Sequence, residues 1–402
     1  MTAYALSRAE PESVGLSSTR LRRIGEALRC EVADGQIPGA VVGIMRGGKL
    51  AHLEAVGYRD AAAKEPLGTD AIFSIASMTK PMTSVAIMSL VEEGRVLLGD
   101  PVANYLPQLA ALKVAQDGGR VEGRAPKRPP TIQDLLRHTS GLTYSERGGT
   151  PAHKAYPGSS IVASERMDRD EVIATLAKAP LLFEPGSDWE YGFSTDVLGF
   201  VVEAVSGMPL GDFLAQRLWS PLGMSDTGFA LPAAKRSRYA LALAKDPLTG
   251  AANPTIHHAT DKTQRWHSGG GGAVATVSDY LRFCEMMRSG GRLGSADVVG
   301  RATVALMTAD HLPAPFFSKI ADAMDPAASG YGFGLGFAVR RQPGIAAMAG
   351  STGDFYWSGV YGTYFWVDPR EQLSVVLLAA APGLIRMRYR QMLRNTVYQA
   401  LT

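Results

Sequence analysis

The sequence predicts an α/β protein in which both chain ends build one antiparallel sheet flanked by helices, with a mainly helical domain inserted between them. Near the N-terminus, apolar runs at residues 40–45 and 50–56 flank an Arg-Gly-Gly-Lys turn, which is typical of a β-hairpin. Near the C-terminus, apolar runs at 361–367 and 372–378 flank an Asp-Pro-Arg-Glu turn in the same way. From 77 to 222 the pattern is mainly helical. Strands at both ends and helices in the middle together define the fold class.

A helix is predicted beside the strands at each end of the chain. Apolar residues recur at helical spacing within residues 17–33, and a second helix is predicted over 384–401. Arg386, Arg390 and Arg394 recur every four residues in this second helix. We interpret them as the solvated face of an amphipathic terminal helix.

The predicted elements divide the chain into two domains. Residues 1–75 and 275–402 form a discontinuous α/β domain, and residues 76–274 form the mainly helical domain. Two long polar loops are predicted at 118–130 and 144–160. Loops of this length in a compact protein often border a binding site, so we expect the active site in the cleft between the domains.

Composition narrows the class of protein. The chain has 402 residues, of which 46% are apolar and 20% charged, with a net charge of +3, so nucleic acid and membrane surfaces are not expected partners. It contains no uninterrupted run of about 18 apolar residues, and its first 22 residues lack a secretory pattern, which predicts a cytoplasmic protein. Cys30 and Cys284 make no disulfide framework. The seven histidines lack metal-binding spacing, so neither metal nor cofactor is predicted. The oligomeric state stays open.

The chemical motif with the clearest meaning is Ser77-Met78-Thr79-Lys80. A serine and a lysine three residues apart share one face of a helix. A desolvated lysine that loses its proton can draw one from the serine, which then attacks a carbonyl carbon. For the motif alone, an N-cap serine beside a solvated lysine is the alternative.

Two later segments offer the other groups that such a nucleophile needs. Residues 183–194 contain Tyr191, whose phenol could pass a proton between serine and leaving group, although a packed core tyrosine is the alternative. Residues 353–361 place small residues at the start of a predicted strand, where a backbone N–H could approach a substrate oxygen. A glycine at the start of a buried strand is the alternative for this segment.

Taken together, the three motifs resemble those of the serine β-lactamase-like superfamily, with the closest similarity to family VIII carboxylesterases. Connecting segments at 135–142, 269–279 and 331–336 agree, so the resemblance covers nearly the whole chain. It implies a class C β-lactamase-like fold with Ser77 as nucleophile, and Lys80 with Tyr191 as the proton-transfer pair. It also implies an oxyanion hole made by the backbone N–H groups of Ser77 and Val360. The residues expected to bind substrate are Phe193, Tyr356, Trp357, Ser358 and Gly359.

The sequence departs from class C β-lactamases at two motifs. Their Tyr-x-Asn is Tyr191-Gly192-Phe193 here, and their Lys-Thr-Gly is replaced by the Trp-Ser-Gly that begins at Trp357. Both changes remove groups that hold a β-lactam. We therefore expect a serine carboxylesterase acting on small short-chain esters. The alternatives are an acyltransferase or transesterase, and a β-lactamase or D-amino-acid peptidase. Because the serine, lysine and tyrosine are intact, a non-catalytic scaffold is disfavoured.

Overall fold

The computed structural model describes residues 6–116, 119–253, 258, 264–313 and 326–402. Its largest sheet has eight strands in the order β10-β11-β12-β13-β14-β1-β2-β3, and the pairs are antiparallel. Strands from the C-terminal part therefore continue directly into strands from the N-terminal part. The bounds are β1 Gly39–Arg46, β2 Lys49–Asp60, β3 Glu65–Pro66, β10 Tyr331–Phe333, β11 Ala338–Arg340, β12 Phe355–Ser358, β13 Tyr364–Asp368 and β14 Leu373–Ala379.

The junction of the two chain ends is the pairing of β1 with β14. Val42 lies opposite Leu377, in the middle of a continuous antiparallel register. The hairpin between β1 and β2 turns at Gly47 and Gly48, whose φ angles of 57° and 78° suit glycine. The predicted sheet built from both chain ends is confirmed.

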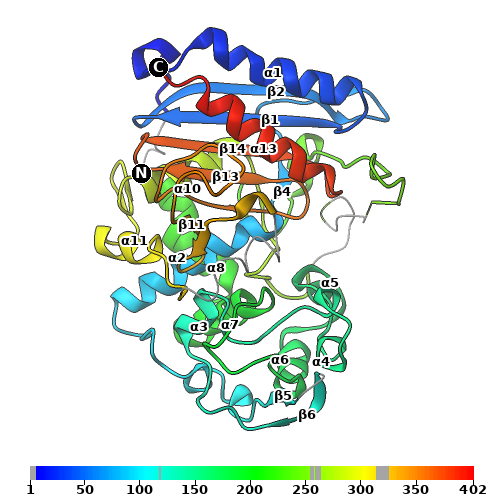
Figure 1. Ribbon diagram of the computed structural model, residues 1–402, viewed down its shortest axis with the longest axis vertical. Coiled ribbons are helices and arrows are strands. Elements are labelled where there is room, and N and C mark those ends of the chain that lie inside the picture. The colour runs from blue at the N-terminus through cyan, green and yellow to red at the C-terminus, as the bar shows by residue number, and fades with distance from the viewer. Residues whose placement is uncertain (1–5, 117–118, 254–257, 259–263, 314–325) are drawn as a thin grey trace.

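Helices cover both faces of this sheet (Figure 1). Helices α1 (Ser18–Ala33) and α13 (Ile385–Tyr398) pack together on one face, and α10 (Val277–Arg288) packs on the other. Gly43 of β1 permits the close approach of α10, because a Cβ there would lie 2.6 Å from a methyl of Val277. The core is thus two layers of side chains, one on each face of the sheet.

The inserted region is mainly helical, as expected, and occupies the lower half of Figure 1. The chain passes into it after β4 (Phe73–Ser74) and leaves it at β7 (Val274–Ala275), and these two strands pair. One buried apolar cluster extends across both regions, so the division into two domains stays a prediction. The remaining helices are α2 Thr79–Glu92, α3 Ile132–Leu136, α4 Pro151–Lys154, α5 Ser160–Arg166, α6 Arg169–Lys178, α7 Ser194–Ser206, α8 Leu210–Leu214, α9 Ser220–Leu222 and α11 Arg301–Met307.

The segment at 118–130 is not wholly loop, contrary to the prediction. Strand β6 (Arg120–Arg124) lies within it and pairs with β5 (Val114–Gln116). Gly118, the first residue of the predicted loop, lies outside the described residues. The other short strands are β8 Arg292–Leu293 and β9 Ala296–Asp297.

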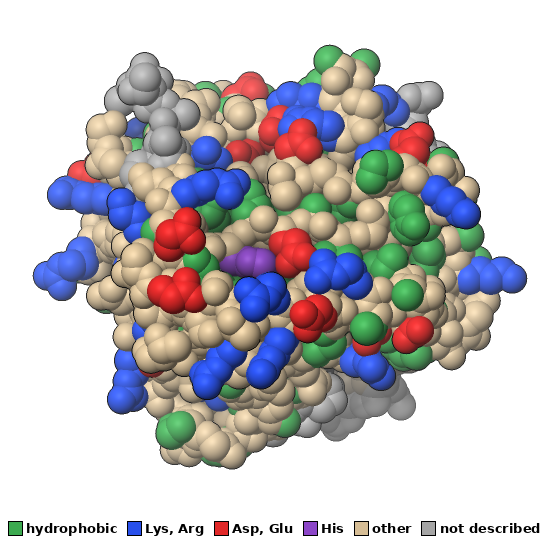
Figure 2. Space-filling view, turned by 90° about the horizontal axis from the view of Figure 1, so that it is seen from above, with side chains coloured by type: hydrophobic (Ala, Val, Ile, Leu, Met, Phe, Trp, Pro, Cys, Tyr) green, Lys and Arg blue, Asp and Glu red, His purple; other side chains and the backbone are tan. Residues whose placement is uncertain are grey.

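The outer surface over the α1 end mixes charges of both signs. Figure 2 shows this face with lysine, arginine and acidic side chains interspersed rather than gathered by sign. Arg29 and Glu54, for example, form an ion pair at 2.7 Å. Among the described helices, no single one has the length and apolar character needed to cross a membrane. Helix α7 and the stretch Leu210–Leu222 meet that test only together, bent by 81°.

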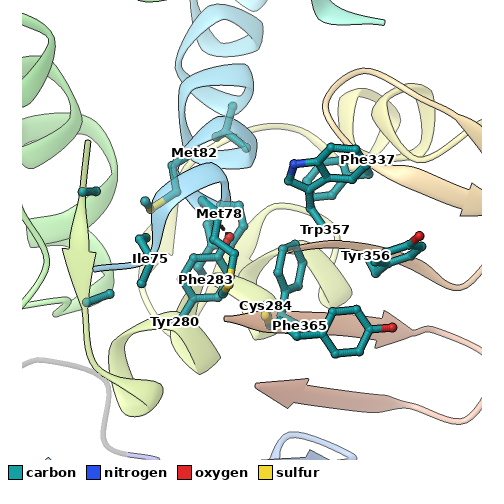
Figure 3. Close-up of a cluster of buried hydrophobic side chains, with 14 of the residues drawn as sticks. Ile75, Met78, Met82, Tyr280, Phe283, Cys284, Phe337, Tyr356, Trp357 and Phe365 are labelled. Carbon is teal, nitrogen blue, oxygen red and sulfur yellow. Dashed lines mark hydrogen bonds between the residues drawn. The ribbon is translucent and has the colours of Figure 1, made fainter. Parts of the chain in front are cut away.

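Helix α2 runs through the centre of the molecule. Every residue from Thr79 to Leu90 is buried, and only the last two residues of the helix reach solvent. Figure 3 shows Met78 beside Tyr280 of α10, and the sulfur of Met82 accepts from Trp219 Nε1 at 3.3 Å. A helix enclosed on all sides holds the residues at its start in fixed positions.

The prediction of a solvated arginine face on α13 is wrong. Arg390 and Arg394 are only 4% and 0% exposed, and Arg386 is half-buried. Arg394 donates to Asp354 at 2.9 Å, and Arg340 donates to the same carboxylate at 2.8 Å. The partner lies 40 residues away along the chain. A periodic pattern within one helix cannot reveal such a partner.

Candidate active site

Ser77 lies in a short 3₁₀ turn that leads from β4 into α2. Its neighbour Ala76 has a φ of 45°, a left-handed conformation that costs a residue with a Cβ roughly 1–2 kcal/mol. The turn is held because Thr79 donates to the Ala76 carbonyl at 2.7 Å and Tyr280 donates to the Met78 carbonyl at 2.8 Å. Ala76 and Met78 are buried, whereas Ser77 is half-buried and lines a cavity. The turn therefore presents one hydroxyl to the cavity.

Lys80 is buried beside this serine, with only 2% of its surface exposed. Its Nζ donates to Ser77 Oγ at 3.5 Å, to Tyr144 Oη at 3.2 Å and to the Gly270 carbonyl at 2.5 Å. An ammonium has three protons, so each one has an acceptor. The structure thus brings the predicted nucleophile and lysine together, with the lysine buried.

Tyr191 approaches Lys80 through the face of its ring. The Nζ of Lys80 lies 4.5 Å from the ring centroid, a cation–π distance. The Tyr191 hydroxyl accepts from Trp357 Nε1 at 3.4 Å, and Tyr191 lines the cavity. The third residue of the predicted catalytic set therefore lies with the other two.

A second tyrosine, which the motifs did not indicate, makes the hydrogen bond to Lys80. Tyr144 lies at the start of the predicted cleft-bordering loop at 144–160, and this position was its only signal in the sequence. Its Oη is 2.5 Å from Ser160 Oγ, at the other end of that segment. Burial, helped by the charge of Asp196, raises the pKa of the Tyr144 hydroxyl well above its ordinary value. Tyr144 therefore faces Lys80 as a neutral phenol at neutral pH.

Asp196, in the first turn of α7, completes a buried polar network behind the lysine. Its carboxylate accepts from Ser160, from Ser268 at 2.7 Å and from the Gly270 N–H at 2.9 Å. Burial raises the pKa of this carboxyl above its ordinary value. A Cβ at Gly270 would lie 2.4 Å from the carboxylate, so glycine is required there. The bond to its N–H also orients the Gly270 carbonyl that faces Lys80.

The end of β12 lies against the chain just before Ser77. A Cβ at Gly359 would lie 2.3 Å from the Ile75 carbonyl oxygen, so only glycine allows this approach. Gly359 donates to the Thr363 carbonyl at 2.9 Å, which fixes the turn that exposes Val360. The two predicted oxyanion donors, Ser77 and Val360, thus both line the same cavity.

Two of the five predicted substrate-binding residues line the cavity, namely Ser358 and Gly359. Phe193 is buried beneath Tyr144, with ring centroids 4.9 Å apart. Trp357 and Tyr356 are also outside the described lining, and Figure 3 shows these neighbouring side chains diverging.

Strand geometry and packing explain why these side chains lie outside the lining. Successive residues of β12 point to opposite faces of the sheet. Trp357 therefore supports Tyr191, at a centroid distance of 5.5 Å, while the ring of Tyr356 lies 5.7 Å from the Arg394 guanidinium on the other face. Phe193, Tyr356 and Trp357 lie behind the lining residues, and a contact of these side chains with substrate stays a prediction.

The cavity has a volume of about 390 Å³. Apolar side chains of α5 and α13 contribute to it, including Ile161, Val162 and Met387. Arg147, Arg386 and Arg390 also line it. The cavity therefore combines a hydroxyl nucleophile with apolar and cationic surfaces. Among the described residues, no group of three or more histidine, cysteine or acidic side chains could hold a metal ion.

A half-buried serine beside a buried lysine and two phenols, on this sheet and helix arrangement, is typical of a serine hydrolase of the β-lactamase/transpeptidase-like fold. A model of the Beta-lactamase family matches residues 24–394. The chain therefore belongs to the Beta-lactamase family.

The chain is similar to several proteins that carry different names. Protein Rv1367c of Mycobacterium tuberculosis is 34% identical over 364 residues, with 87% of each chain covered. Esterase EstB of Burkholderia gladioli is 31% identical over 399 residues, with 94% of each chain covered. The solved structure of EstCE1, a hydrolase with promiscuous acyltransferase activity, has a TM-score of 0.78 and 29% identity, and the match covers 94% of this chain and 99% of EstCE1.

Proposed function

We propose that this chain is a serine carboxylesterase (EC 3.1.1.-), of the family VIII type, that hydrolyses short-chain esters through an acyl-enzyme on Ser77. The observation that carries the proposal is the buried Lys80, with Nζ 3.5 Å from a serine hydroxyl at a partly apolar cavity. The similarity to Esterase EstB supports the same class of reaction.

The proposed reaction has two halves. Ser77 Oγ bonds to the carbonyl carbon while its proton passes to the unprotonated member of the Lys80–Tyr191 pair, and the N–H groups of Ser77 and Val360 hold the oxyanion. One such donor is worth about 3 kcal/mol in comparable enzymes. The alcohol leaves with the proton. Water then attacks the acyl carbon, and its proton returns to Ser77 as the acid is released.

The third motif favours esters over β-lactams in this proposal. Trp357 replaces the lysine that helps to hold a β-lactam carboxylate, and Phe193 replaces the asparagine of the second motif. A missing charge-assisted contact costs roughly 1.5 to 3 kcal/mol, about tenfold to a hundredfold or more. We expect kcat/KM for p-nitrophenyl butyrate to exceed that for nitrocefin. The reverse order would favour a β-lactamase.

The decisive experiment is substitution and labelling of the nucleophile. Ser77→Ala should lower kcat by about 10³-fold or more, and a phosphonate ester should add its mass to the peptide that contains Ser77. Ser89→Ala is the matched control, because Ser89 lies near the end of α2 and donates to the Ala86 carbonyl. Label on another serine, with Ser77→Ala still active, would sink the proposal. No turnover and no label in the native chain would favour a scaffold.

Acyl transfer is the second candidate, favoured by the similarity to EstCE1. In that reaction an alcohol replaces water in the second half. An added acceptor alcohol should then yield a new ester from the same acyl-enzyme. A small-molecule ester as partner, the lack of nucleic-acid or membrane partners, and a cytoplasmic location stay predictions.

A further inference from the structure

The two expected oxyanion donors lie in two tight turns of the chain. One turn comprises residues 75–78, in which the N–H of the last residue donates to the carbonyl of the first at 3.0 Å. The other comprises residues 359–362, which is closed in the same way at 3.1 Å. Ser77 and Val360 each occupy a central position, so the bonds that close the turns use other N–H groups. Both residues line the same cavity.

One peptide unit connects Val360 to an arginine of α13. The Val360 N–H and the Gly359 carbonyl belong to the same planar trans amide, so a partner that orients the carbonyl also orients the N–H. Arg390 donates from Nη2 to the Gly359 carbonyl at 2.6 Å, and to the Thr363 carbonyl at 3.1 Å. In a trans amide the N–H points away from the carbonyl. The arginine on one side of the amide therefore sets the direction of the N–H on the other side.

Arg390 is suited to hold this amide still. Its side chain is buried, and its guanidinium lies 5.8 Å from the centroid of the Tyr364 ring on β13. A charged donor makes a stronger hydrogen bond than a neutral one, and it polarises the amide that accepts the bond. A polarised amide has a stronger N–H donor at its other end. Arg390 thus acts on Val360 through the peptide between them.

Thr363 ties the two turns to each other. Its Oγ1 donates to the Ile75 carbonyl, the first residue of the serine turn, at 3.0 Å. Its own carbonyl accepts the Gly359 N–H at 2.9 Å. Thr363 is fully buried, so these bonds are shielded from water. The Val360 N–H is therefore fixed relative to the turn that holds Ser77.

We propose that Arg390 is a positioning residue for the oxyanion hole, acting through the Gly359–Val360 peptide, and that Thr363 holds this peptide against the serine turn. This inference rests on the proposed esterase function and adds the residues that position its oxyanion donor. The Val360 N–H acts on charge that develops on the substrate oxygen in the transition state. Loss of Arg390 should therefore lower kcat and leave KM nearly unchanged.

The test compares an ester with its thiono twin, in which sulfur replaces the carbonyl oxygen. p-Nitrophenyl butyrate and O-(p-nitrophenyl) thionobutyrate meet the same nucleophile, but sulfur is a weaker hydrogen-bond acceptor than oxygen. Arg390→Gln should lower kcat for the oxygen ester about tenfold to a hundredfold, and the oxygen-to-sulfur ratio of kcat/KM about tenfold. An arginine that only supports the fold would lower the rates of both esters equally. Butylboronic acid, whose tetrahedral adduct with serine carries an oxygen at the oxyanion position, gives a second reading without turnover, and its Ki should rise about tenfold.

Tyr389→Phe is the matched control. Tyr389 belongs to the same helix and donates to the Gly362 carbonyl of the same turn at 3.0 Å. That carbonyl shares its amide with the Thr363 N–H rather than with the Val360 N–H, so the oxygen-to-sulfur ratio and the boronate Ki should stay native. Thr363→Val, which replaces one hydroxyl with a methyl group, takes the place of Arg390→Gln if that variant does not fold. Its ratio should fall about threefold.

The outcomes separate this inference from the proposed function. A native oxygen-to-sulfur ratio and a native boronate Ki in folded Arg390→Gln, or in Thr363→Val where it takes that place, overturn the inference and leave the esterase standing. An equal fall of the ratio in Tyr389→Phe also overturns it, because any loosening of the turn would then have the same effect. A lack of turnover of the oxygen ester by the native chain overturns the esterase proposal, and this inference with it.

Discussion

Two segments of the chain each bring a tyrosine to Lys80, and they do so in different ways. The second-motif segment presents Tyr191 face-on, with the ammonium 4.5 Å from the ring centroid. The loop at 144–160 presents the Tyr144 hydroxyl, 3.2 Å from the same ammonium. One phenol holds the lysine through its ring and the other through a hydrogen bond.

The two tyrosines also differ in what lies behind them. Behind Tyr191 are the apolar and aromatic side chains of Trp357 and Phe333, packed at centroid distances of 5.5 and 5.2 Å from one ring to the next. Behind Tyr144 is the polar chain of Ser160 and Asp196. The Tyr191 hydroxyl thus contacts only an indole N–H in the bonds described above, whereas the Tyr144 hydroxyl belongs to a buried polar network. We infer that Tyr191 moves protons and that Tyr144 positions the lysine.

The largest expected effect tests the inferred proton transfer by Lys80 and Tyr191. Lys80→Ala and Tyr191→Phe should each lower kcat by about 10²- to 10⁴-fold, the usual contribution of general acid–base catalysis. The double variant should lose little more than either single variant, because members of one relay give non-additive losses. The measurement is kcat for p-nitrophenyl butyrate in all four proteins. Losses that multiply in the double variant would show two independent roles.

A smaller effect on kcat is expected from the residues that position Lys80. Tyr144→Phe and Asp196→Asn should each lower kcat about tenfold, because each weakens the network that orients Lys80 and moves no substrate proton. Their double variant should again lose little more, and the pH profile of Tyr144→Phe should keep the native shape. Asp170→Asn is the matched control, because Asp170 is 86% exposed on α6. If Tyr144→Phe lowered kcat as much as Tyr191→Phe, the assignment of a positioning role to Tyr144 would be contradicted.

The smallest expected effect concerns stability rather than rate. His138 is fully buried against Tyr191 at a centroid distance of 4.8 Å, and burial lowers its pKa well below 6.5. The unfolded chain therefore binds a proton below pH 6.5 that the folded chain does not, so stability is lost as pH falls. The loss is about 1.4 kcal/mol per pH unit until the folded pKa is reached.

His138→Asn should remove this part of the pH dependence. Asparagine tolerates the left-handed φ of 59° that His138 adopts after α3, so the backbone can be kept. Urea unfolding at pH 7 and pH 5.5 measures the difference in unfolding free energy. The native chain should lose about 1.4 kcal/mol more than the variant over this interval. An equal loss in both would assign the pH dependence to other groups.

The comparison also shows what the sequence could predict. The Gly47–Gly48 turn and the serine–lysine pair are local features, because a few neighbouring residues determine their geometry. Tyr144 meets Lys80 across 64 residues, and its contact depends on how a long loop folds back. Arg394 likewise contacts the Asp354 carboxylate only because the tertiary fold brings the two residues together. Local chemistry was predictable, and partners supplied by distant segments were not.

Strand geometry explains which residues of the third motif line the cavity. Tyr356 and Trp357 were predicted together because they are neighbours in a motif. In β12 they belong to opposite faces, and Tyr356 pairs with Trp366 while Trp357 pairs with Phe365. The motif identifies the strand, but only the sheet decides which of its side chains turns toward Ser77.

The pairing of β1 with β14 has a consequence for biosynthesis. A ribosome makes the strands of residues 39–60 and the nucleophile Ser77 long before it makes β12 and β14. Until residue 379 has emerged, β1 lacks the neighbour with which it pairs from Ala40 to Arg46. Val360 and the arginines of α13 are also missing at that stage. The nascent chain therefore carries its serine and lysine as an incomplete site, and we expect the site to form only when residues 355–398 fold onto β1 and α2.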